Sequence, residues 1–142
     1  MKIMLDKGAK MPTRAHPWDA GLDLYAPVDS GSCYNITPCG GSVTIDTGVH
    51  MEIPEGYVGF IKAKSGLNVK HGLTCTGVID AHYTGSIAVK LYNHHPCLRY
   101  DVMPGDKIAQ LVILPCVMPH LELVDNLSPT DRGDGGFGST GR

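Results

Sequence analysis

Glycine and proline interrupt this chain so often that they limit the length of any helix. The 142 residues include 18 glycines and 10 prolines, and the longest stretch without either, Ser86–His95, has ten residues. An average helix has about 11–12 residues, and both residue types are unfavourable inside one. This spacing excludes a helical bundle and disfavours an α/β fold with repeated crossover helices. We therefore expect short strands joined by turns.

The hydrophobic pattern supports this expectation. Between Val43 and Ile53 the apolar residues keep one parity, with a bend expected at Gly48, and Ile87–Leu91 alternates in the same way. Strands are predicted over residues 43–53, 57–64, 72–79, 87–91, 107–114 and 121–124, and a short helix over 65–71. Such a pattern is typical of an all-β sandwich, jelly roll or barrel. We expect one β domain over residues 1–129.

Composition excludes several classes of function. Twelve basic and 14 acidic residues give a net charge of −2, which argues against a broad basic surface for a nucleic-acid polymer. No apolar run is long enough for a membrane span, and residues 1–12 lack the apolar region of a signal peptide. Five cysteines without a C-x-x-C pair predict free thiols in a reducing cytoplasm. Trp18 is expected in the core.

Two polar, glycine-marked segments early in the chain could carry chemistry. Asp19 and Asp23 flank Gly21 and could hold a metal ion or its waters. The alternative is an Asx turn at Asp19 and a strand residue at Asp23. Further along, Lys64-Ser65-Gly66 combines a cation, a hydroxyl group and a free backbone N–H, which suits a small anion. This segment could equally be a plain corner between a strand and a helix.

Two more segments lie in the second half of the chain. Residues 77–85 look like a hairpin that presents Asp80 and Tyr83 to a ligand, although Asp80 could also be an ordinary turn residue. Aspartate is depleted in strands, so its presence there suggests a partner or a function. Gln110 lies in a strongly apolar strand and needs hydrogen bonds from the backbone or from a ligand.

The last segment, residues 130–142, contains five glycines and no aliphatic residue, so we expect a flexible arm. Its glycines free backbone N–H groups for anions, and Arg132 adds a bidentate donor. Phe137 stands alone among glycines, which indicates a lid that stacks on a flat ligand, or else a disordered tail. The spacing of a P-loop is present without its lysine. With no G-x-S-x-G motif, a covalent nucleophile is disfavoured and an aspartate could activate water.

In this order, the five segments resemble the five motifs of the trimeric dUTP diphosphatases, the dUTPase family. The matching segments are DAGLDLYAP at 19–27, KSGLNVKHG at 64–72, GVIDAHYTGSI at 77–87, GDKIAQLVILP at 105–115 and RGDGGFGSTG at 132–141. The resemblance implies an all-β, jelly-roll-like barrel that forms a homotrimer with its sites at subunit interfaces. The C-terminal arm of one chain would close over a site built by the other two.

The resemblance also implies the reaction, in which dUTP and water give dUMP and diphosphate with Mg²⁺ as cofactor. This reaction keeps uracil out of DNA and supplies dUMP for thymidylate synthesis. Asp80 matches the base that activates the attacking water, and Asp23 matches the carboxylate that holds Mg²⁺ through water. Tyr83 matches the residue that excludes a 2′-OH. Substrate contacts are implied for Lys64, Ser65, Gly66, Gly77, Val78, Ile79, Tyr83, Gln110, Arg132, Phe137, Gly138, Ser139 and Thr140.

Two residues depart from the family pattern. Lys64 stands where arginine is commoner, and His82 stands where aspartate or glycine is more usual. A dCTP deaminase has a similar fold but needs a glutamate near the base, and none of Glu52, Glu55 and Glu122 lies in the hairpin motif. A regulatory protein that uses the nucleotide as a switch is the other alternative. The complete set of motifs favours the hydrolase.

Overall fold

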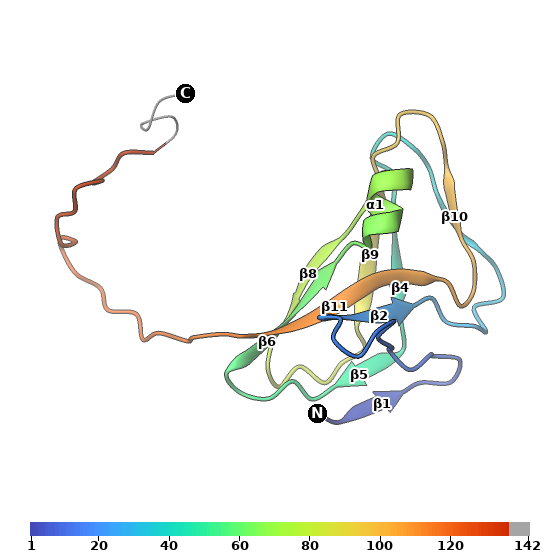
Figure 1. Ribbon diagram of the computed structural model, residues 1–142, viewed down its shortest axis with the longest axis horizontal. Coiled ribbons are helices and arrows are strands. Elements are labelled where there is room, and N and C mark those ends of the chain that lie inside the picture. The colour runs from blue at the N-terminus through green and yellow to red at the C-terminus, as the bar shows by residue number, and fades with distance from the viewer. Residues whose placement is uncertain (137–142) are drawn as a thin grey trace.

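The structure, a computed structural model, describes residues 1–136 and consists mostly of β-strands (Figure 1). The strands are β1 (Ile3–Leu5), β2 (Gly21–Tyr25), β3 (Tyr34–Ile36), β4 (Ser42–Asp46), β5 (Val49–Met51), β6 (Tyr57–Lys62), β7 (Leu73–Thr74), β8 (Thr76–Ile79), β9 (Ala88–Asn93), β10 (Tyr100–Val102) and β11 (Lys107–Pro115). The helix α1 covers Ser65–His71, as the sequence predicted. The expected all-β class is confirmed.

The strands form four antiparallel sheets. The two larger ones have the orders β2-β11-β6-β8 and β4-β9-β7, and the two smaller ones pair β1 with β5 and β3 with β10. No pairing among residues 1–136 closes any of these sheets into a barrel. The barrel implied by the resemblance is therefore not found, and the architecture is a set of open sheets around one core.

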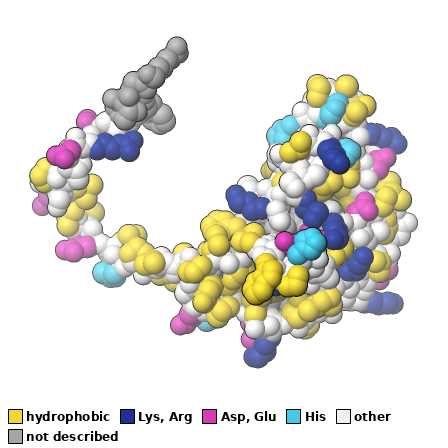
Figure 2. All heavy atoms as spheres, in the orientation of Figure 1, with side chains coloured by type: hydrophobic (Ala, Val, Ile, Leu, Met, Phe, Trp, Pro, Cys, Tyr) yellow, Lys and Arg dark blue, Asp and Glu magenta, His cyan; other side chains and the backbone are white. Residues whose placement is uncertain are grey.

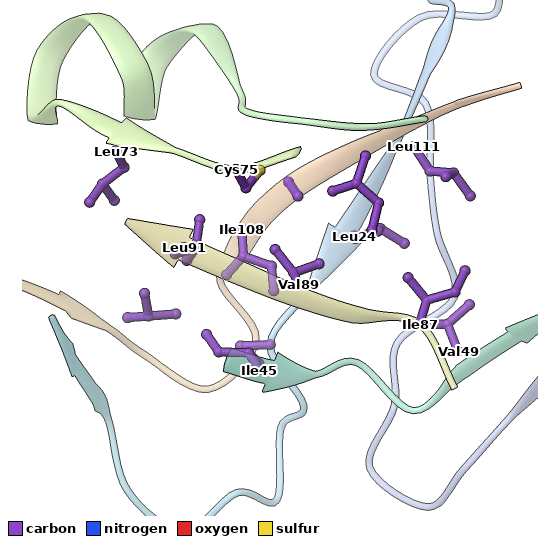
Figure 3. Packing of buried hydrophobic residues seen from close by; sticks show 14 of the residues in the cluster. Leu24, Ile45, Val49, Leu73, Cys75, Ile87, Val89, Leu91, Ile108 and Leu111 are labelled. Atoms are coloured by element: carbon purple, nitrogen blue, oxygen red, sulfur yellow. The ribbon is translucent and has the colours of Figure 1, made fainter. Parts of the chain in front are cut away.

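The core lies where side chains from both larger sheets meet (Figure 3). On β9, Val89 and Leu91 are buried, while Lys90 between them is exposed. Ile108 and Leu111 of β11 belong to the same buried cluster. The predicted period-2 pattern thus matches the burial of β9, and the strand packs one face against the opposite sheet.

Gly48 separates two strands that the sequence analysis treated as one bent strand. Its φ of +66° lies in the left-handed region, which glycine adopts without strain. An added Cβ would also lie only 2.9 Å from the Cβ of Ala9. The chain therefore turns at Gly48 and changes sheets, because β4 pairs with β9 and β5 pairs with β1.

Two sequence expectations are wrong. Residues 121–124 form no strand, and the chain from Cys116 to Gly136 runs away from the sheets without regular structure (Figures 1 and 2). Leu121 and Leu123 are 86% and 101% exposed, since no neighbouring strand pairs with this segment. Trp18 is 96% exposed and lies outside the core. Among residues 1–136, no helix is long and apolar enough to cross a membrane.

Candidate functional site: two separate clusters

Asp23 is the centre of the first cluster. Because side chains alternate along β2, Leu24 enters the core and Asp23 points to the opposite face of the sheet. The Asp23 side chain is only 7% exposed, and its two oxygens accept hydrogen bonds from Lys64 and from Lys107, whose Nζ lies 2.8 Å away. A buried carboxylate is tolerated when it is paired in this way.

These partners control the charge of the cluster. Burial by itself raises the pKa of Asp23, but hydrogen bonds and charges from Lys107 and Lys64 outweigh burial and bring the pKa below its usual 3.8. The hydrogen bond from Lys107 to Asp23 in turn raises the pKa of the lysine. At neutral pH the cluster thus holds one negative and two positive charges. Its net positive charge suits an anion.

Gln110 lies directly opposite Asp23 in the pairing of β11 with β2. Its Nε2 donates to the backbone oxygen of Ala63 at 3.3 Å, so the backbone supplies one of the hydrogen bonds that the sequence called for. Gly21 leaves room for this side chain, because an added Cβ would collide with its amide oxygen. The position of Gln110 therefore depends on a glycine of the neighbouring strand.

A cavity of about 320 Å³ lies beside this cluster, and its lining includes Asp23, Lys64 and Gln110. The structure therefore brings three of the predicted site residues together. Ser65 and Gly66 follow Lys64 in exposed positions at the start of α1. No atom lies within 4 Å of an added Cβ at Gly66, so the space beside it is open.

Asp19 also lines this cavity, but its side chain has a local function. Its Oδ2 accepts the N–H of His16, three residues earlier, at 2.9 Å. This bond closes the loop but is not the expected Asx turn, whereas Asp23 does lie in a strand, as that alternative had it. Among residues 1–136, no group of three or more histidine, cysteine or acidic side chains could hold a metal ion.

The second cluster lies on β8 and the segment after it. The expected hairpin is wrong, because β8 pairs with β6 whereas β9 pairs with β4 and β7. Residues Asp80–Ser86, which we call the crossing segment, therefore connect two different sheets. Asp80 is exposed there, and its backbone oxygen accepts the N–H of Tyr83 at 3.2 Å.

The ring of Tyr83 has a defined place in the crossing segment. Its hydroxyl donates to the backbone oxygen of Ser86 at 3.0 Å. An added Cβ at Gly85 would lie 2.5 Å from that hydroxyl, so only glycine lets the ring lie there. Tyr83 is 46% exposed. It can therefore contact a ligand on its outer side.

Asp80 lines a cavity of about 540 Å³ together with His82, Glu55 and Cys116. The Nε2 of His82 lies 3.1 Å from a carboxylate oxygen of Glu55. This cavity and the cavity beside Asp23 share no residue. One chain therefore presents the candidate site residues as two separate clusters.

The arm residues add little to either cluster in this chain. Arg132 is exposed, and its Nε donates to the backbone oxygen of Gly135 at 2.9 Å. The other arm residues singled out by the sequence, Phe137, Gly138, Ser139 and Thr140, lie outside the described residues.

Sequence analysis missed Lys107 as a site residue. It reaches Asp23 because β11 pairs with β2, with a register shift between Lys107 and Ala109. A β-bulge of this kind changes the direction of side chains near it. The only sequence signal is a lysine at the start of a strongly apolar strand, and that signal does not identify its partner.

Fold and clusters together define a class: a small, mostly β protein with a lysine-lined cavity for an anion and an exposed aspartate beside a tyrosine. Comparison with known families makes this specific. The family described as dUTPase matches residues 7–141, so the chain belongs to the dUTPase family.

Individual relatives are similar in sequence to this chain over nearly its whole length. The deoxyuridine 5'-triphosphate nucleotidohydrolase of Leifsonia xyli subsp. xyli is 42% identical over 135 residues, which are 93% of this chain and 86% of the relative. The Arabidopsis thaliana enzyme of the same name is 44% identical over 138 residues, 96% of this chain and 80% of the relative.

Solved structures show the same fold. A mutant dUTPase of Staphylococcus bacteriophage 80alpha with dUpNHpp has a TM-score of 0.87 at 32% identity and covers 99% of this chain and 98% of its own. A mutant dUTPase of phage phi11 of S. aureus, described with a structural Mg(II) ion, has a TM-score of 0.79 at 30% identity and covers 90% of this chain and 98% of its own.

Proposed function

We propose that this protein is a dUTP diphosphatase that hydrolyses dUTP to dUMP and diphosphate, keeping uracil out of DNA and supplying dUMP for thymidylate synthesis. The observation that carries the proposal is the family match over residues 7–141, together with a cationic cavity at Asp23 and an exposed Asp80 beside Tyr83. The first cluster suits phosphates, and the second suits a sugar and a water molecule.

The active unit is a homotrimer with shared sites. Two observations support this part of the proposal: the clusters occupy different cavities, and the segment after β11 exposes apolar side chains that a second copy could cover. Those side chains are Val117, Met118, Leu121, Leu123 and Leu127. Residues 1–129 then form the β domain, of jelly-roll type, and residues 130–142 close over a site of the trimer.

Asp80 acts as the base. It accepts a proton from water as the water oxygen attacks the α-phosphorus, and the bond from that phosphorus to the oxygen bridging to the β-phosphate breaks. An exposed carboxylate on a loop can approach a bound nucleotide in this way, and a positioned base contributes about 10²–10⁴-fold. Tyr83, held over Gly85, packs on the deoxyribose and leaves no space for a 2′-OH.

The uracil base binds along β8. This strand is at the edge of its sheet, and no other described strand pairs with its outer side. An edge strand presents free N–H and C=O groups, which match the alternating donors and acceptors of uracil. Gly77, Val78 and Ile79 supply these groups.

The phosphates bind in the cavity beside Asp23, with contacts from Lys64, Ser65, Gly66 and Gln110. Mg²⁺ usually keeps several waters and bridges phosphates, so a single protein carboxylate that accepts hydrogen bonds from those waters suffices. Asp23 fits, since its oxygens retain lone pairs beside the two lysines. When bound, the ion supplies positive charge for the phosphates. Arg132, Phe137, Gly138, Ser139 and Thr140 of the arm complete the nucleotide contacts.

The test is a product assay with purified protein and Mg²⁺ on dUTP, dCTP and UTP. We expect dUMP and diphosphate from dUTP, with little turnover of the other two. Release of ammonia from dCTP would identify a deaminase instead, and binding of dUTP without turnover would identify a nucleotide-controlled regulator. Analytical ultracentrifugation should show a trimer; a stable monomer with full activity would contradict the shared site.

A further inference from the structure

His50 connects two segments that are far apart in the sequence. It lies in the middle of β5, and its side chain is 18% exposed. Its Nδ1 lies 2.8 Å from the backbone oxygen of Thr84, in the crossing segment. Its Nε2 lies 3.1 Å from the Oδ2 of Asp6, which follows β1. The imidazole ring therefore bridges the N-terminal region and the segment that carries Asp80 and Tyr83.

Both partners of this ring can only accept hydrogen bonds. A backbone carbonyl oxygen has no proton to give, and neither has an ionised carboxylate. A neutral imidazole has one N–H and satisfies one of the two contacts, whereas an imidazolium donates to both. The geometry therefore requires His50 to be protonated when both contacts are made.

The charges around the ring favour the same state. The hydrogen bond to Thr84 and the one to Asp6 raise the pKa of His50 above its usual 6.5, and the charge of Asp46 on β4 adds to this. Lys2 and Glu52 line the same cavity as His50 and form an ion pair with each other at 3.0 Å. The charges of Lys2 and Glu52 thus offset each other. The negative charges of Asp6 and Asp46 therefore determine the electrostatic effect on the His50 ring.

The crossing segment has few other attachments to the body of the protein. The Tyr83 hydroxyl bonds within the segment, to Ser86. Ser86 in turn donates to Asp46, and beyond it Ile87 donates its N–H to Val49 at 2.8 Å. On the other side of Tyr83, His82 contacts Glu55, but those two side chains are 75% and 83% exposed. The contact from His50, whose side chain is 18% exposed, to Thr84 is therefore the more buried of the two attachments beside Tyr83.

We propose that His50, as the imidazolium, is a positioning residue that fixes Thr84 and thereby the ring of Tyr83 against the sugar of the substrate. This inference rests on the proposed function and deepens it, because it assigns part of the sugar discrimination to a residue that does not touch the nucleotide. Loss of His50 should allow the Tyr83 ring to move and make room for a 2′-OH.

The first experiment compares His50→Leu with the matched control His94→Leu. His94 is more exposed than His50 but is likewise hydrogen-bonded, to Thr74 at 2.8 Å, and this bond involves no residue of the crossing segment. For His50→Leu we expect the ratio of kcat/KM for dUTP over UTP to fall about tenfold, in line with a lost hydrogen bond from a charged donor. Deuterium exchange in residues 81–86 should become faster. The control should change neither.

A conservative variant separates positioning from folding. His50→Lys keeps a positive group with several donors, so it should restore the dUTP over UTP ratio and slow the exchange again. If His50→Leu unfolds the protein, Asp6→Asn provides the same test, since it removes one acceptor charge and should lower the pKa of His50. A ratio that stays at the wild-type value in a folded His50→Leu protein overturns the inference.

Nitrogen-15 NMR of the histidine ring gives a readout that does not require activity. Both ring nitrogens should carry protons in most molecules at pH 6.5, and a mostly neutral ring at that pH would refute the proposal. In the wild type, the dUTP over UTP ratio should fall as pH rises through the pKa of His50, and it should stay flat in His50→Lys. If the wild type does not hydrolyse dUTP, the proposed function fails, while NMR and exchange still decide whether His50 holds Thr84.

Discussion

The two clusters are built in different ways, although each contains one aspartate of the proposed site. Asp23 lies on a central strand, is buried, and has a lysine on each carboxylate oxygen. Asp80 lies in a connection between two sheets, is exposed, and depends on a few hydrogen bonds around it. Buried, paired groups become exposed to water only when the whole domain unfolds, whereas exposed segments can unfold locally. The Asp23 cluster, which we propose binds the phosphates, is thus held in place by its own contacts, whereas the crossing segment can adapt.

The same difference gives opposite responses to pH. The pKa of Asp23 is lowered on folding, so its contribution to stability is present above pH 3.8 and is lost as pH falls through the folded value. The pKa of His50 is raised, so its contribution is present below pH 6.5 and is lost as pH rises through the folded value. We therefore expect acid to weaken the Asp23 cluster, and a rise in pH through the folded pKa of His50 to loosen the crossing segment.

The largest expected effect comes from Asp80→Asn. This variant should lower kcat about 10²–10⁴-fold, because asparagine cannot accept the proton of the attacking water. Its melting temperature should match the wild type, since Asp80 is exposed and its side chain supports no buried contact. Steady-state kinetics and calorimetry check both parts; near-normal kcat would mean that water is activated by another group.

Deletion of residues 133–142 should have the next largest effect. Loss of base stacking alone corresponds to about 1–3 kcal/mol, or roughly five- to 150-fold in kcat/KM. The proposed trimer and the melting temperature should be unchanged, because the deleted residues contain no aliphatic side chain. Full activity of the truncated protein would show that the arm does not belong to the site.

Asp23→Asn tests how much the buried Asp23 cluster contributes to the free energy of unfolding. We expect a loss of about 1–3 kcal/mol in urea at pH 7, less than for a fully buried pair because both lysine side chains are partly exposed and can regain water. The difference from wild type should shrink as pH falls through the folded pKa of Asp23. Asp29→Asn, at an exposed carboxylate, is the control and should be neutral.

Tyr83→Ala should have a small effect on stability and a selective effect on activity. Because the ring is 46% exposed, its loss should cost little in unfolding free energy. The ratio of kcat/KM for dUTP over UTP should fall about tenfold, since the space for a 2′-OH opens. A variant that weakens dUTP and UTP equally would assign the ring to binding alone.

Short-range patterns predicted much of the fold. The alternation along β9 and the helix at Ser65–His71 depend on neighbouring residues, so the sequence contains their signal. The strand expected at 121–124 failed because an apolar stretch forms a strand only when another strand pairs with it. The prediction that Trp18 lies in the core was wrong for a similar reason, since the type of a side chain does not indicate whether its loop faces the core.

Some features of the candidate site could likewise be predicted from the sequence, and others could not. Motif residues such as Asp80 and Gln110 could be named from the sequence, but their separation into two cavities could not, because it depends on which strands pair. Lys107 contacts Asp23 across 84 positions, and His50 contacts Thr84 across 34. Contacts of this kind arise from strand register, and the residues themselves are an ordinary lysine and histidine at exposed-parity positions.

The loop before β2 has a practical consequence. Asp19, whose side chain accepts the N–H of His16 and whose backbone oxygen accepts a hydrogen bond from Arg14 at 2.7 Å, fixes a tight loop that leaves Trp18 in solvent. Asp19 also lines the cavity beside Asp23, and Trp18 comes directly before it in the sequence. Because Trp18 is the only tryptophan of the chain, its fluorescence comes from a single position. The unlabelled protein therefore carries an optical reporter one residue away from the lining of that cavity.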